Sequence, residues 1–235
     1  MTALDQSAAK TLATGGMRAK NRGLATALFL MCLAAIATSA RAAEDHVLSL
    51  VWKPTSDVND PPSIFTPERW THDYAKDPPP SDAFEGVRVQ VLPFVDARKE
   101  KTIGSNTEEH WPRLITTKDD VAAFVTTHLG EVLQAAHVNV VESGATRLLR
   151  GEVRTFFVDE DNTYRGTVIL QLTLTDAAGH ELWQGPATGH SKRFGHSLSE
   201  ENYNETFSDS LVDAVTDLLK NHTFLQAARR SAKAH

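Results

Sequence analysis

The strongest constraint on the fold is a pair of long runs in which apolar and polar residues alternate. Leu148–Val158 and Tyr164–Leu174 flank a short polar stretch, Asp159–Thr163, that is rich in turn-forming residues. Alternation with a period of two is typical of strands that bury one face, so the two runs predict a β-hairpin. A second turn at Asp176–Gly179 leads into the segment from His180 to Phe194. We expect a three-stranded antiparallel meander, with Pro186 forcing a bulge or break in its last strand.

Two helices and two further strands complete the predicted fold. Val87–Val95 alternates like a strand and ends in a polar loop that runs from Asp96 to Pro112, and Val138–Val141 indicates a second core strand. Residues 118–136 repeat apolar side chains every three or four positions, after a predicted cap at Thr117 and acids at Asp119 and Asp120. A second helix begins at Ser199–Asn202, and its apolar stripe is Tyr203, Phe207, Leu211, Val215 and Leu218. The elements predict an α+β two-layer sandwich, mainly an antiparallel sheet with two amphipathic helices on one face.

The N-terminal residues carry an export signal. Arg18, Lys20 and Arg22 precede an apolar run over 24–37, and Ala40–Ala42 fits the small-x-small rule, which predicts cleavage between Ala42 and Ala43. The run holds about fourteen residues, fewer than the ~20 of a membrane-spanning helix, which is the alternative. Translation from Met17 instead of Met1 and lipidation of Cys32 stay open, although Phe29–Met31 is a poor lipoprotein signal. We expect the periplasm of a Gram-negative bacterium, with outer-membrane association as the further option.

These signals divide the chain into four parts. Residues 1–42 are the N-terminal extension and signal peptide, 43–85 a short strand and Pro-rich arm, 86–224 the α+β domain, and 225–235 a flexible basic tail. Residues 53–86 hold seven of the ten prolines, together with Phe65, Trp70 and Tyr74. Since a patch of exposed aromatics is costly in water, we expect residues 54–85 to wrap the domain or to form a docking face.

Charge and cysteine usage exclude several classes of function. Residues 1–42 contain five of the 24 basic residues and one of the 30 acidic residues, so their removal takes the formal charge from −6 to −10. Nucleic acids and anionic membrane surfaces need cationic patches, so neither is an expected partner. Cys32 is the single cysteine, which excludes a disulfide framework and a multi-cysteine metal site.

The sequence contains none of the motifs that mark common enzyme classes. It has no H-E-x-x-H, no G-x-S-x-G and no phosphate-binding glycine loop. The acidic groups Asp159–Asp161 and Glu200–Glu201 fit a hydrated hairpin tip and the first turn of a helix. We therefore expect no enzyme, no cofactor and no metal.

Three short motifs carry a resemblance to a known family. They are Val89–Arg98 followed by Ile103-Gly104, Leu149–Val153, and the run Gly166–Leu172. Together they resemble the YajG family of bacterial envelope lipoproteins over residues 86–224. The chain is more loosely similar to auxiliary lipoproteins of lipid-exporting ABC systems and to the penicillin-binding-protein activator LpoB. The resemblance implies a small α+β domain at the outer membrane without known catalysis.

A small set of charged and aromatic side chains is the candidate partner-binding site. Asp96 and Arg98 follow a buried strand, where they either tie down the loop that follows or form a recognition spot. The aromatic and guanidinium candidates are Trp111, Trp183, Arg193 and Phe194. We predict a non-catalytic periplasmic accessory protein that binds or scaffolds an envelope protein. The alternative is an auxiliary component of an envelope lipid-transport system, which a deep apolar pocket would favour.

Overall fold

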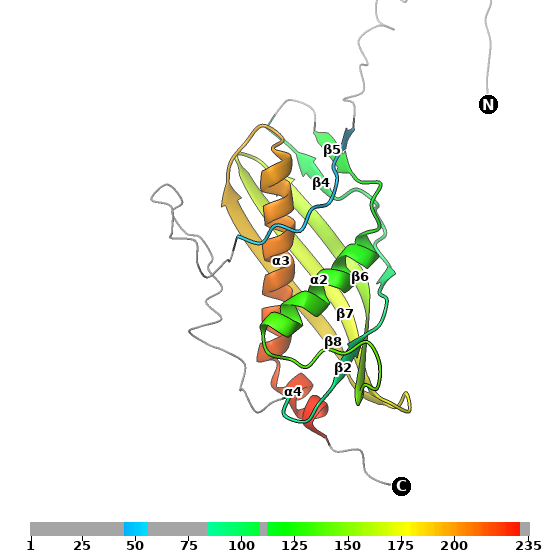
Figure 1. The fold of residues 1–235 in the computed structure, drawn as a ribbon. Coiled ribbons are helices and arrows are strands. Elements are labelled where there is room, and N and C mark those ends of the chain that lie inside the picture. Colours follow the sequence, from blue (N-terminus) through cyan, green and yellow to red (C-terminus); the bar gives the residue numbers. More distant parts are fainter. Residues whose placement is uncertain (1–44, 56–83, 109–111, 231–235) are drawn as a thin grey trace, which may run out of the picture. The chain divides into compact units, whose positions relative to one another are not determined.

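Three long antiparallel strands form one half of the sheet in the computed structural model, which describes residues 45–55, 84–108 and 112–230. They are β6 (Arg147–Glu160), β7 (Thr163–Asp176) and β8 (Glu181–Phe194), paired in chain order (Figure 1). The two turns between them use left-handed residues, Asn162 with φ 60° and Gly179 with φ 89°. Asparagine and glycine tolerate that conformation best, which explains why the chain reverses at these positions. The predicted meander is confirmed.

Strand β8 runs through Pro186 without the expected bulge or break. Pro186 pairs with Gln171, and the register of the β7–β8 pair shifts between Leu174 and Thr175 instead. The amides of Thr188 and His190 donate to side chains of the following helix. The backbone N–H groups of the even-numbered residues in this part of β8 therefore point away from β7. Pro186 shares their parity, and its missing N–H therefore costs no bond of the ladder.

Short N-terminal strands extend the sheet beyond β6. The strands β2 (Val89–Val91), β3 (Val95–Asp96) and β4 (Gly104–Asn106) each pair parallel with a successive part of β6. Then β5 (Arg113–Thr116) pairs antiparallel with β4, and β1 (His46–Val47) pairs parallel with β5. Within the described residues the sheet thus has eight strands, mixed but mostly antiparallel in its long pairs.

Several details of this N-terminal region differ from expectation. The strand predicted over 87–95 is interrupted after Val91. The Leu92 amide still donates to the Leu149 carbonyl, and the chain leaves the ladder at Pro93 and Phe94. The predicted loop after Asp96 contains β4 and β5, and the strand expected from His46 to Trp52 ends at Val47. The segment Val138–Val141 forms a single bridge, from Val140 to Val89, instead of a strand.

The helices α2 (Val121–Ala135) and α3 (Glu200–Lys220) lie on the same face of the sheet (Figure 1). Ser199 caps α3 as predicted, and its side chain accepts a hydrogen bond from the amide of Asn202. The cap of α2 is Asp120, which accepts from the amide of Ala123, and not the predicted Thr117. The α+β two-layer sandwich with both helices on one face is confirmed.

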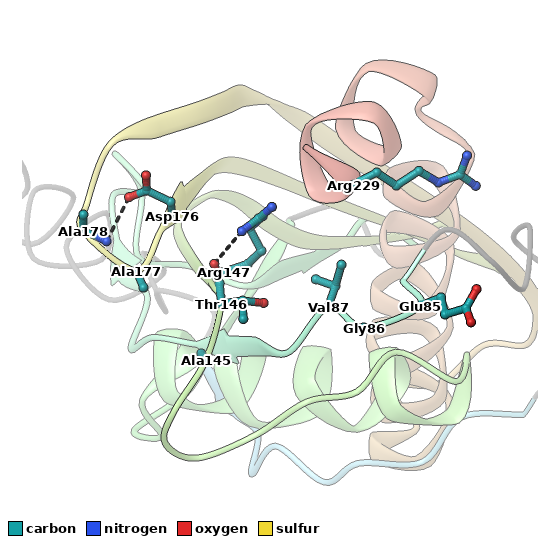
Figure 2. A pocket seen from close by; sticks show the side chains of 10 residues that line it. All are labelled: Glu85, Gly86, Val87, Ala145, Thr146, Arg147, Asp176, Ala177, Ala178 and Arg229. Atoms are coloured by element: carbon teal, nitrogen blue, oxygen red, sulfur yellow. Dashed lines mark hydrogen bonds between the residues drawn. The ribbon is translucent and has the colours of Figure 1, made fainter. Parts of the chain in front are cut away.

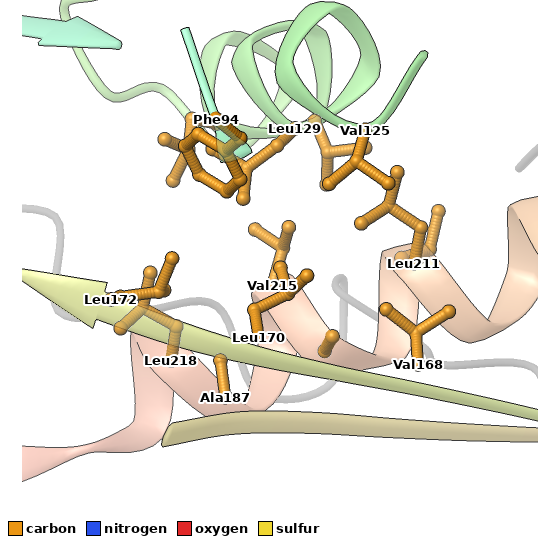
Figure 3. Packing of buried hydrophobic residues seen from close by; sticks show 14 of the residues in the cluster. Phe94, Val125, Leu129, Val168, Leu170, Leu172, Ala187, Leu211, Val215 and Leu218 are labelled. Carbon is orange, nitrogen blue, oxygen red and sulfur yellow. The ribbon is translucent and has the colours of Figure 1, made fainter. Parts of the chain in front are cut away.

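The core lies between this helical layer and the sheet. Figure 3 shows Leu211, Val215 and Leu218 of α3 pointing toward Val168 and Leu170 of β7. All five side chains are almost fully buried, as is most of the predicted stripe. Small residues allow α3 to come very close to β8: a Cβ on Gly189 would lie 1.9 Å from the carbonyl oxygen of Ser210. The helix backbone therefore packs directly on the strand backbone at this point.

A third helix continues the fold beyond its predicted end. Residues 225–235 were expected to be a flexible tail, but α4 spans His222–Arg229 and buries Leu225, Ala227 and Ala228. The Phe224 ring lies 6.2 Å from Phe84 and 5.1 Å from Trp183, so α4 closes one end of the core. The signal peptide, with Cys32, Ala42 and Ala43, and most of the Pro-rich arm lie outside the described residues.

Candidate functional site

Asp96 and Arg98 form an internal ion pair at the end of β3. The Nε and Nη2 atoms of Arg98 each lie 2.9 Å from a carboxylate oxygen of Asp96, and Lys101 Nζ lies 2.9 Å from Oδ2. The hydrogen bonds from Arg98 hold the pKa of Asp96 well below its usual range, with further help from Lys101 and against the opposing effect of burial. Arg98 is only 8% exposed. The geometry matches the first of the two interpretations, in which the carboxylate ties down the loop that leads to β4.

Arg193 and Trp183 are also used within the domain. Arg193 Nε donates to Asn202 Oδ1 at 2.8 Å, and its Nη1 forms an ion pair with the buried Glu205. Trp183 Nε1 donates to Thr223 Oγ1 at 2.9 Å, while the indole meets Phe224 edge-on. These contacts fasten β8 to α3 and α4, as tryptophan does when it completes a core.

The candidate residues do not come together in one place. Phe194 is 71% exposed at the end of β8. Trp183 lies eleven residues away on the same strand, which corresponds to about 36 Å at ~3.3 Å per residue. Asp96 is separated from β8 by β6 and β7, and Trp111 lies outside the described residues. Of the described candidates, Phe194 presents the most free surface.

A buried polar network that the sequence analysis missed surrounds Glu160. Glu160 is completely buried, not part of a hydrated hairpin tip, and accepts from Tyr203 Oη at 2.8 Å and from the Leu198 amide at 3.0 Å. Burial, followed by the hydrogen bond to Glu160, raises the pKa of both Tyr203 and Tyr164 above the usual range. Leu198 has a φ of 54°, so the carboxylate holds a left-handed turn just before α3. Glu160 follows the buried residues Phe156 and Val158 at the same spacing of two in β6, and this alternation could have revealed its burial.

A cleft with charged and apolar residues in its lining opens at the other end of the sheet, between the start of β2, the turn after β7 and α4 (Figure 2). It encloses about 440 Å³, and its charged lining consists of Glu85, Arg147, Asp176 and Arg229. Arg147 is 5% exposed and donates to the carbonyls of Ala228, Thr146 and Arg230. Burial lowers the pKa of Arg147 and the nearby Asp176 carboxylate opposes this. Because a cation stabilises the C-terminal end of a helix, Arg147 acts here as an anchor for α4.

The described residues contain no group of three or more His, Cys, Asp or Glu side chains placed to hold a metal ion. Asp176 lines the cleft in Figure 2. Its carboxylate accepts hydrogen bonds from its own turn, from the amides of Ala178 and His180, both at 2.9 Å. The His180 ring lies 2.9 Å from its second oxygen and is the main cause of its lowered pKa. The carboxylate thus stabilises the tight turn between β7 and β8.

A second candidate surface is the sheet face opposite α2 and α3. None of the described helices lies on this face (Figure 1). Alternate residues of β6, β7 and β8 that are not buried point to it, including Arg150, Glu152, Phe157, Ile169, Thr173, Thr188 and His190. A sheet face that presents both polar and apolar side chains is suited to contact a protein.

Comparisons with known proteins find distant structural likeness alone. No family model matches the chain, and no curated protein matches it. Similar solved structures include a Xanthomonas campestris protein of the DUF330 family, with 12% identity and a TM-score of 0.43 over 57% of this chain and 81% of that one. PelC of Paraburkholderia phytofirmans, solved as a dodecamer, has 16% identity and a TM-score of 0.33 over 54% and 86%. A minor lipoprotein from Acinetobacter baumannii has 14% identity and a TM-score of 0.31 over 60% and 92%.

These neighbours are bacterial proteins and include a lipoprotein, but they do not single out the YajG family or LpoB. At such identities and TM-scores they establish no shared function, so the family resemblance stays a prediction. Among the helices of the described residues, none is both long and apolar enough to cross a bilayer.

Proposed function

We propose that this chain is an exported, non-catalytic accessory protein of the bacterial cell envelope, and that it acts by binding another envelope protein through the open face of its sheet. The export signal supports the compartment. The face of β6, β7 and β8 on which none of the described helices lies carries the proposal, because polar and apolar side chains both project from it.

The polar residues that could suggest catalysis have structural partners. Asp96 holds Arg98, Glu160 holds Leu198, and Arg193 joins Asn202 to Glu205. Each of these contacts fixes a loop or a helix, which is how a scaffold uses buried charge. Four of the ten residues that line the cleft in Figure 2 are charged, and the large buried apolar side chains pack against one another in the core. This arrangement favours protein binding over the alternative of carrying apolar ligands.

Site-directed cross-linking tests the proposal sharply, because cleavage after Ala42 removes Cys32 and leaves a chain without cysteine. Thr173→Cys places a thiol on the open sheet face, and Gln134→Cys places a matched thiol on the exposed surface of α2. A thiol-directed photo-cross-linker should give a discrete adduct in intact envelopes from Thr173→Cys alone. Adducts from both positions, or from Gln134→Cys alone, would contradict the sheet-face assignment.

Two further measurements test the remaining parts of the proposal. N-terminal sequencing of the exported protein should begin near Ala43, whereas a species that starts at an acylated Cys32 would show lipid anchoring instead. Hydrolytic turnover by the purified protein, abolished by a substitution in the described domain, would contradict a non-catalytic role.

A further inference from the structure

The segment that follows β1 lies across the helical layer as an extended peptide. We call residues 49–55 the strap. In Figure 1 the strap crosses α3 between β1 and residue 55. Every second backbone amide of the strap donates to a side chain of α3. The pairs are Val51 to Asn204 Oδ1 at 2.9 Å, Lys53 to Ser208 Oγ at 2.9 Å, and Thr55 to Asp209 Oδ1 at 2.8 Å. Pro54 falls between these positions, where no amide is needed.

The α3 residues beneath the strap are polar although they are buried. Asn204 and Glu205 are each 6% exposed, and Ser208 is fully buried. Asn204 contacts the strap backbone twice, because its Nδ2 also donates to the Ser49 carbonyl at 3.1 Å. A buried amide or hydroxyl in a helix is costly without a partner, so this stripe is suited to bind an extended backbone.

Two side chains of the strap add specificity. The Trp52 indole stacks on the His128 ring, with centroids 4.4 Å apart and an interplanar angle of 3°, and meets Phe124 edge-on. Lys53 forms ion pairs with Glu201 and Glu205. The surface between α2 and α3 thus recognises an aromatic residue followed by a cation.

We propose that this surface is a binding site for an extended segment of a partner protein in which an aromatic residue precedes Lys or Arg, and that the strap occupies it as an internal, displaceable competitor. The chemistry of the partner follows from the groups that hold the strap. The rings of Phe124 and His128 contact Trp52, and two carboxylates pair with Lys53. Polar side chains of α3 accept from the strap backbone. The site lies on the helical layer, so it is distinct from the sheet face of the proposed function and does not depend on it.

Part of the strap is exposed, while Leu50 and Trp52 pack against the edge of the core. Val51 is 53% exposed, and the Lys53 side chain is 45% exposed. Upstream, β1 and the buried Leu48 hold the chain to β5 independently.

A peptide-binding measurement on the mature full chain tests the proposal. The probe is a fluorescein-labelled peptide with the strap sequence, Ser-Leu-Val-Trp-Lys-Pro-Thr, and binding is followed by fluorescence anisotropy. The receptor is the double variant Trp52→Ala, Lys53→Ala, which weakens the internal strap and keeps the groove. We expect it to bind the probe at least tenfold more tightly than the wild type does. A control peptide with Ala for Trp and Glu for Lys should not bind.

Adding Glu201→Gln to the double variant should weaken probe binding, because it removes an exposed carboxylate that pairs with Lys53. Equal binding to wild type and double variant, or no binding to a double variant that melts like the wild type, would overturn the proposal. A double variant that fails to fold would also overturn it, because the strap would then be a structural element and not a displaceable one.

Discussion

The two halves of the sheet are built in different ways. The meander of β6, β7 and β8 consists of three strands of 14 residues that pair with their neighbours in sequence. The N-terminal half consists of five strands of two to four residues, three of which use β6 as a parallel template. Parallel pairing between distant segments needs a preformed partner strand, whereas hairpins form locally. We infer that the meander and α3 contribute most of the free energy of unfolding and that each strand of the N-terminal half contributes a smaller part.

The contact between α3 and β8 gives the most severe test of this comparison. Gly189→Ala would place a Cβ 1.9 Å from the Ser210 carbonyl oxygen and 2.3 Å from the Ala214 amide nitrogen. Both atoms belong to a helix backbone that cannot move away alone, so we expect a loss of about 4 kcal/mol in chemical denaturation. Gly130→Ala is the control, because its Cβ meets nothing within 4 Å. That change should stabilise α2 by up to ~1 kcal/mol.

Truncation of the core beneath α3 should come next in size. Leu211 is fully buried and points toward the strands in Figure 3. Leu211→Ala removes buried apolar surface and leaves a cavity, so unfolding should become easier by about 3 kcal/mol, within the ~2–5 kcal/mol range of such changes. An effect below about 0.5 kcal/mol would mean that α3 does not pack on the meander as described.

The same contrast explains which elements the sequence predicts. The meander and α3 were predictable because alternation, turns, capping by Ser199 and a long apolar stripe all act over short distances. In contrast, β4 consists of Gly104, Ser105 and Asn106, which have no apolar alternation, and they form a strand because β6 offers free backbone groups. The short helix α4 was not predicted, because the basic residues near the C-terminus indicated a flexible tail. Phe224 and Leu225 nevertheless supply the buried face of this helix.

The candidate site was less predictable than the fold for a physical reason. Arg98 and Arg193 were chosen for their chemistry, but whether a guanidinium is free depends on partners such as Asp96 and Glu205, whose positions follow from the tertiary fold. Trp183 was open to the same ambiguity, and its partner Thr223 lies forty residues away. The sequence predicts a short strand up to Trp52 and an arm from residue 54 that wraps the domain or docks a partner. The contacts of the strap with α3 were not predictable, because its hydrogen bonds go to helix side chains and leave no pattern in its own sequence.

In the N-terminal half, a smaller effect is expected from the ion pair at Asp96. Asp96→Asn removes a charged acceptor from Arg98 and Lys101, which should lower stability by about 1–2 kcal/mol at neutral pH. The pKa of Asp96 is depressed in the folded protein, so its contribution is present above the unfolded pKa of ~3.9 and is lost as the pH falls further. Melting temperatures from pH 7 to pH 2 should therefore fall less steeply below pH 4 in Asp96→Asn than in the wild type. Glu181→Gln, on the exposed start of β8, is the charge-matched control.

The smallest change in stability is expected at the outer edge of β8, where substitutions should instead change the association of the protein. Asp217 accepts from the Thr188 amide at 3.0 Å and Asp213 accepts from the His190 amide at 2.7 Å, so α3 covers an edge that could otherwise pair with another strand. Because water can replace each acceptor, Asp213→Ser with Asp217→Ser should cost only about 1 kcal/mol in total. The uncovered amides should instead promote association that rises with protein concentration, measured by light scattering against the wild type at equal concentrations. Glu131→Ser, on the exposed face of α2, is the control, since it removes an acidic side chain that covers no strand edge. If the double variant associates no more than the wild type, the edge is protected by Pro186 and by the twist of the strand, and the two carboxylates serve only to position α3.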